Sequence, residues 1–71
     1  MVWFFERGGQ YVRCETLNSP DGSGYQLVIT HPNGSTTTEQ FDDSGELSKR
    51  QKALENGLVA DGWAGPYGRL F

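Results

Sequence analysis

The N-terminal segment of the chain constrains the fold more than any other segment. Residues 2–14 hold two stretches of strand-forming residues on either side of the Gly-Gly pair at residues 8–9. Two glycines accept the positive φ angles of a two-residue turn, so we expect a β-hairpin. A strand with one buried face alternates apolar and polar residues. Because Trp3, Phe4 and Phe5 are consecutive, both faces of the first strand must meet apolar partners or carry a functional patch.

The turn also determines which residues of this hairpin share a face. With residues 8–9 as the loop, the expected cross-strand pairs are Arg7 with Gln10, Phe5 with Val12, and Trp3 with Cys14. One face then carries Trp3, Phe5, Val12 and Cys14, which we assign to the core. The other face is mixed and carries Val2, Phe4, Glu6, Tyr11, Arg13 and Glu15.

Length, charge and cysteine content exclude several classes of protein. A chain of 71 residues is enough for one domain with a small core. The formal net charge of −3 argues against a nucleic-acid binder and against docking to anionic lipid. The apolar runs are too short to span a membrane. The single cysteine, Cys14, excludes an internal disulfide and a cysteine-rich zinc site, and it favours a reducing, cytoplasmic setting.

A second hairpin is expected around the turn His-Pro-Asn-Gly at residues 31–34. A two-residue Asn-Gly loop would leave Pro32 at a ladder position, where its missing N–H is costly. A three-residue loop with Gly34 in the left-handed conformation avoids this cost. It also places Tyr25, Leu27, Ile29 and Phe41 on one face. The threonine-rich strand at residues 35–41 is poor in aliphatic residues and is expected at an edge.

A helix is expected after the fourth strand. Asp43 and Glu46 have the spacing of a capping box, and Leu47, Leu54 and Leu58 follow at helical intervals. The acidic and basic residues around the helix start are expected to support it, with Glu46 pairing with Arg50. Two ends compete, Gly57 and Gly62. We favour Gly62, because Trp63 and Leu58 then take the two positions that touch in a Schellman cap.

These elements predict an α+β fold, a four-stranded antiparallel meander in the order β-β-β-β-α with the helix packed on one face. Residues 1–63 form the single expected domain. Residues 64–71 show no periodicity and are expected as a C-terminal tail, packed on the sheet or at an interface. The expected core is Trp3, Phe5, Val12, Cys14, Tyr25, Leu27, Ile29, Phe41, Leu47, Leu54, Leu58 and Trp63.

One helix covers only one face of a sheet, so the other face needs an explanation. Its candidate interface residues are Val2, Phe4, Tyr11, Arg13 and Val28. A contiguous apolar patch on a monomer indicates an interaction site. Three arrangements remain open: the tail covers the patch, a second copy packs on it, or the apolar residues are scattered, with Phe4 partly covered by Arg13.

No motif predicts a catalytic, cofactor or metal site. Cys14 and His31 fall on the helix-facing side, where a buried cysteine and a turn-adjacent histidine have structural explanations. Asp42 and Asp43 are explained by the helix start. We therefore expect a non-enzymatic, homodimeric protein-interaction module that uses the helix-free face. The alternative is a weak single-stranded nucleic-acid module, in which Phe4, Tyr11, Arg7 and Arg13 would stack on bases and contact phosphate.

Overall fold

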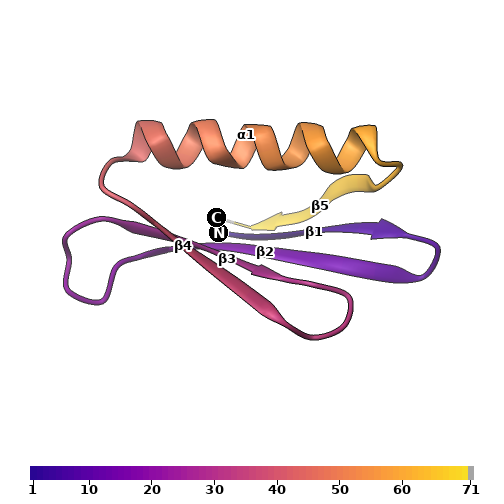
Figure 1. The fold of residues 1–71 in the computed structure, drawn as a ribbon, viewed down its shortest axis with the longest axis horizontal. Coiled ribbons are helices and arrows are strands. Elements are labelled where there is room, and N and C mark those ends of the chain that lie inside the picture. Colours follow the sequence, from indigo (N-terminus) through magenta and orange to yellow (C-terminus); the bar gives the residue numbers. More distant parts are fainter. Residues whose placement is uncertain (71) are drawn as a thin grey trace.

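The computed structural model describes the backbone of residues 1–70 and the side chains of residues 1–68. Its elements in chain order are β1 (Val2–Arg7), β2 (Gln10–Asn18), β3 (Tyr25–Thr30), β4 (Thr36–Phe41), α1 (Ser44–Ala60) and β5 (Ala64–Leu70). The strands form one antiparallel sheet in the order β4-β3-β2-β1-β5, and α1 runs along one face of it (Figure 1). The expected α+β class is confirmed, but the sheet has five strands rather than four.

Both hairpins have the expected registers. In the first, Arg7 lies opposite Gln10 and Trp3 opposite Cys14, around two glycines with φ angles of 58° and 82°. In the second, Tyr25 lies opposite Phe41. Gly34 has a φ of 88°, and its N–H donates to the carbonyl of His31, as the three-residue turn requires. The edge position of β4 is also confirmed.

Both ends of α1 are capped as the sequence predicts. At the start, the backbone N–H of Glu46 donates to the Asp43 carboxylate at 2.8 Å. At the end, Gly62 has a φ of 91°, and the N–H of Trp63 donates to the carbonyl of Leu58 at 2.9 Å. This is the Schellman pattern, so the helix continues past Gly57 and ends before Gly62.

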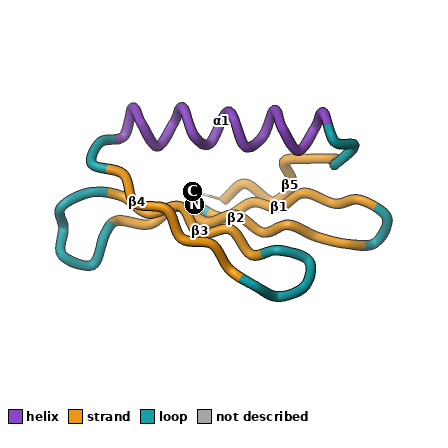
Figure 2. The backbone as a smooth tube through the Cα atoms, in the orientation of Figure 1, coloured by secondary structure: helices purple, strands orange, loops and turns teal. Residues whose placement is uncertain are grey.

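The expected irregular tail is wrong for residues 64–70. They form β5, which pairs with the free edge of β1 through register shifts on either side of the pair formed by Phe4 and Tyr67 (Figures 1 and 2). Gly65, Pro66 and Gly68 interrupt any alternation of apolar and polar residues, and Pro is confined to edge strands because it has no N–H to donate. This composition explains why the strand has no periodic signature. Phe71, also part of the expected tail, lies outside the described residues.

The core lies between α1 and the sheet and contains all of the expected residues. Among the described side chains, eight hydrophobic ones are buried: Trp3, Phe5, Val12, Cys14, Leu27, Ile29, Leu47 and Trp63. Met1, Tyr25, Phe41, Leu54 and Leu58 pack around them. Of these residues only Met1 was not expected in the core. The inner side chains of β1 and β2 therefore have a structural explanation.

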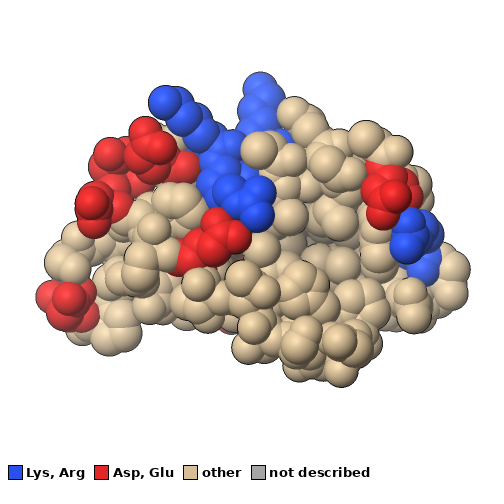
Figure 3. Space-filling view, viewed as in Figure 1, with Lys and Arg blue, Asp and Glu red and all other residues tan. Residues whose placement is uncertain are grey.

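The charged side chains on the helix side hold α1 to the sheet at two places. Arg50 makes two hydrogen bonds to the Glu39 carboxylate of β4, at 2.8 and 3.1 Å, so the expected Glu46–Arg50 pair is wrong. Glu46 instead lies 3.6 Å from Lys49. Near the helix end, Arg7 donates to the Asp61 carboxylate at 2.9 Å. Figure 3 shows acidic residues gathered where the helix begins, with basic residues beside them along the helix.

Candidate interaction surface

The face of the sheet that α1 does not cover places aromatic residues from three strands side by side. Phe4 of β1 lies opposite Arg13 of β2 on one side and Tyr67 of β5 on the other. Directly paired residues of neighbouring strands point to the same face, so these three side chains form one row. Tyr11, opposite Glu6, lies at the next outward-facing position of β2.

Phe4 is the centre of a small aromatic cluster. Its ring lies 5.7 Å from that of Tyr11, edge to face, and 5.6 Å from that of Tyr67. Both distances are within the range of favourable aromatic pairs. Tyr11 and Tyr67 are 55 % and 47 % exposed, although both are large apolar side chains. The cluster therefore stabilises itself only in part and leaves much of its apolar surface in water.

A shallow hollow of about 280 Å³ opens on this face. Its lining is almost wholly apolar and consists of Val2, Phe4, Tyr11 and Arg13. These are four of the five residues that the sequence predicted for an interface. The structure brings them together on β1 and β2, because the hairpin register sends alternate side chains to the same face.

Val28, the fifth predicted residue, lies on the same face but apart from the hollow. Glu15 separates it from Val2, since Glu15 of β2 is paired with Val2 on one side and with Val28 on the other. The Arg13 guanidinium lies 3.3 Å from the Glu15 carboxylate. This exposed ion pair divides the aromatic cluster from the polar half of the face on β3 and β4. The apolar residues are gathered rather than scattered, and Val28 is peripheral to them.

Tyr67 belongs to the cluster and was missed by the sequence analysis. Its position depends on the pairing of β5 with β1, which bulges and glycines obscure in the sequence. Gly68, the next residue, has a φ of 69°, and a Cβ atom there would lie 3.2 Å from the Phe4 ring. The available signal in the sequence was an aromatic residue between Pro66 and Gly68 in an otherwise aperiodic segment.

The cysteine and the histidine show no features of a nucleophilic pair. Cys14 is 0 % exposed, and burial raises the pKa of its thiol to about 11. A thiol in this state is a poor nucleophile at neutral pH. The His31 ring lies with Nε2 2.9 Å from the Thr37 hydroxyl. Both residues have structural roles on the helix side of the sheet.

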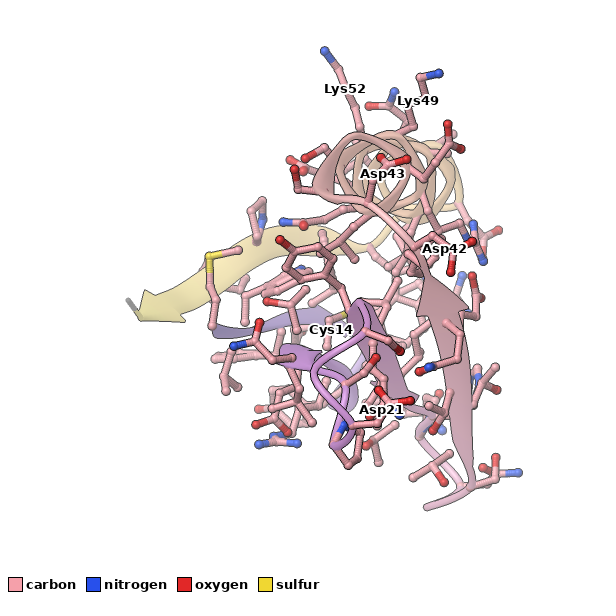
Figure 4. All side chains as sticks on the ribbon, turned by 90° about the vertical axis from the view of Figure 1, so that its left-hand side faces the viewer. Cys14, Asp21, Asp42, Asp43, Lys49 and Lys52 are labelled. Atoms are coloured by element: carbon pink, nitrogen blue, oxygen red, sulfur yellow. The ribbon has the colours of Figure 1, made fainter. Side chains whose placement is uncertain are left out.

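The acidic residues are also spread over separate parts of the fold. Figure 4 shows Asp43 at the start of α1 and Asp21 in the loop between β2 and β3, on the other side of Asp42. The Asp21 carboxylate accepts hydrogen bonds from the N–H and hydroxyl of Ser23, which lower its pKa. Within the described residues, no three His, Cys, Asp or Glu side chains gather in a way that suits a metal ion.

Arg7 lies on the side of the sheet away from the aromatic cluster. Its guanidinium lies 4.7 Å from the centre of the Trp63 ring and bonds to the Asp61 carbonyl and carboxylate. The placement of Arg7 in a nucleic-acid site with Phe4 and Tyr11 is therefore wrong. Among the side chains of residues 1–68, the cation beside the cluster is Arg13, which already contacts an acid.

No protein family, curated protein or solved structure was found that matches this chain. In the part of the chain that is described, no helix has both the length and the apolar character needed to cross a membrane.

Proposed function

We propose that this protein is a non-enzymatic interaction module that forms a homodimer through the helix-free face of its sheet. The observation that carries the proposal is the exposed aromatic cluster of Phe4, Tyr11 and Tyr67 beside an apolar hollow. Exposed clusters of this kind are typical of protein interfaces, where Tyr and Phe are enriched. The buried thiol of Cys14 and the separated acids support a non-catalytic role. A single free cysteine also fits the cytoplasm.

The size of the face predicts how strong the dimer is. Strands about 4.8 Å apart and about 20 Å long give the sheet a face on the order of 500 Å². Stable interfaces bury about 800 Å² on each partner. We therefore expect a concentration-dependent dimer with a dissociation constant in the micromolar range or above.

Sedimentation equilibrium over a wide concentration series tests this proposal. We expect the wild type to dimerise, and Phe4→Ser and Tyr11→Ser to stay monomeric with an unchanged far-ultraviolet circular dichroism spectrum. Val59→Ser is the matched control, because Val59 is 52 % exposed but lies on α1. A wild type that stays monomeric up to millimolar concentration would refute the homodimer.

Single-stranded nucleic acid is the alternative occupant of the same face. The charges around the cluster disfavour the binding of nucleic acid. Arg13 has two acids near it on this face, Glu6 and Glu15, and its guanidinium contacts the carboxylate of Glu15. Oligonucleotide titration at low salt, followed by tyrosine fluorescence, separates the two functions. We expect no binding by the wild type, whereas binding that Tyr11→Ser abolishes would replace the homodimer by this alternative.

A further inference from the structure

Charges of both signs lie close to the aromatic cluster on the helix-free face. Arg13 is the cross-strand partner of Phe4, and Glu6 is the partner of Tyr11. The Arg13 side chain is 49 % exposed, and its contact with Glu15 is a single one at 3.3 Å. An exposed pair of this kind contributes little and exchanges partners readily. A face that carries both signs around an apolar centre can complement a second copy of itself.

The register places these groups on a simple grid. Neighbouring strands are about 4.8 Å apart, and outward-facing residues along one strand are about 6.6 Å apart. Around Phe4, the strand partners are Arg13 on one side and Tyr67 on the other, and Val2 and Glu6 lie before and after it on β1. Tyr11 lies diagonally from Phe4, beside Glu6.

A two-fold axis that stacks this face on itself lies in the plane between the two copies. Three directions through Phe4 bring like charges together. An axis along β1 places Glu6 opposite Glu6 of the second copy, and an axis across the strands places Arg13 opposite Arg13. The diagonal axis through Phe4 and Glu15 places the two Glu15 carboxylates together. Like charges that face each other across an interface weaken it.

The other diagonal, through Phe4 and Tyr11, has none of these conflicts. With the axis along this diagonal, Phe4 faces Phe4 of the second copy and Tyr11 faces its Tyr11. The two-fold rotation also brings Arg13 beside Glu6 of the second copy. Tyr67 comes to lie beside Val2 of the second copy. The strands of the two sheets then cross steeply, as in orthogonal sheet packing rather than the aligned class.

We propose that a second copy of this chain binds about this diagonal axis, with Phe4 and Tyr11 at the centre and two ion pairs between Arg13 and Glu6 of opposite copies. This inference rests on the proposed homodimer and adds its geometry. The aromatic residues supply the affinity, while the two ion pairs select the orientation of the partner.

The geometry is tested by reversing the charge of Arg13 or Glu6 and then mixing the two variants. By sedimentation, Arg13→Glu and Glu6→Arg should each raise the dimer dissociation constant by about tenfold, because each replaces two attractive pairs with repulsive ones. Mixing the two variants should restore wild-type affinity, since both interfacial pairs are then attractive in the heterodimer. Arg13→Gln and Glu6→Gln, which carry no repulsion, should weaken the dimer less and keep the fold intact.

The control is a mixture of Arg13→Glu with Glu15→Arg. In the proposed dimer this mixture keeps one repulsive pair, so wild-type affinity is not restored. Recovery in this mixture, or no recovery in the first one, would overturn the diagonal geometry while the dimer itself stands. A monomeric wild type would instead overturn the proposed function, so the two failures are distinguishable.

Discussion

The two faces of β1 carry side chains of the same kind but lie in different surroundings. Trp3 and Phe5 are 1 % and 0 % exposed beneath α1, packed with Trp63 and the inner residues of β2. Phe4 lies between them in sequence, yet its ring packs against Tyr11 and Tyr67 on the open face of the sheet. The difference shows that a strand residue is buried only when another element covers the face of the sheet to which its side chain points. In this molecule, α1 covers one face and leaves the other available for a partner.

Truncation of adjacent phenylalanines is the strongest test of this comparison. Phe5→Ala should lower the free energy of unfolding by about 3–5 kcal/mol, because it removes a fully buried ring from a core that cannot refill the space. Phe4→Ala should lower it by about 1 kcal/mol, since part of its ring is already in water. Urea unfolding followed by tryptophan fluorescence measures both. Equal losses at a concentration where the protein is monomeric would show that Phe4 is also a core residue.

Titration of the buried thiol gives the next largest effect. The pKa of Cys14 is raised to about 11 in the folded state, from 9.0 for an unburied thiol. The unfolded chain therefore loses this proton at lower pH than the folded chain does, and the stability contributed by Cys14 is lost as pH rises from 9.0 to about 11. The loss is on the order of 3 kcal/mol, since each pKa unit corresponds to about 1.4 kcal/mol.

The difference in stability between wild type and Cys14→Ala, measured at each pH, isolates this contribution from the titration of tyrosine and lysine. Iodoacetamide should also leave the thiol of the native protein unmodified at neutral pH and label it in urea. Rapid labelling of the native protein would contradict the buried position of Cys14.

The ion pairs on the two sides of the sheet give the smallest effect. The hydrogen bonds from Arg50 lower the pKa of Glu39. Their contribution is therefore present above the ordinary carboxyl pKa and is lost as pH falls through the lowered one. Glu39→Gln should cost up to about 1 kcal/mol at neutral pH, because both partners are partly exposed. It should also reduce the fall in stability measured by urea unfolding below about pH 5.

Glu15→Gln is the matched change on the open face, where the carboxylate has one contact to Arg13 at 3.3 Å. It should cost less than Glu39→Gln in the monomer. A larger cost for Glu15→Gln would mean that the open face holds the sheet together more than the helix side does.

Turn and cap residues in the sequence predicted most of the structure on the helix side of the sheet. The glycines at residues 8–9, Gly34 and Gly62 lie at turns and at a helix end, where their positive φ angles have a direct steric reason. These positions predicted the registers, the helix end and hence the core. The partner of Arg50 was not predictable, because Glu39 lies on another element and reaches it only through packing. The opposed positions of Arg7 and Phe4 follow from alternation along β1, so the predicted hairpin register was enough to place them on different faces.

The sequence by itself determined the hairpins, the helix and the division of β1 into two faces, because turns, caps and alternation act between residues close in the chain. Only the tertiary structure decided that residues 64–70 join β1 and add Tyr67 to Phe4 and Tyr11. That pairing joins distant segments through backbone hydrogen bonds, and its glycines and proline leave no periodic pattern to detect. The aromatic cluster on the open face is therefore a product of the fold as much as of the opening run of aromatic residues.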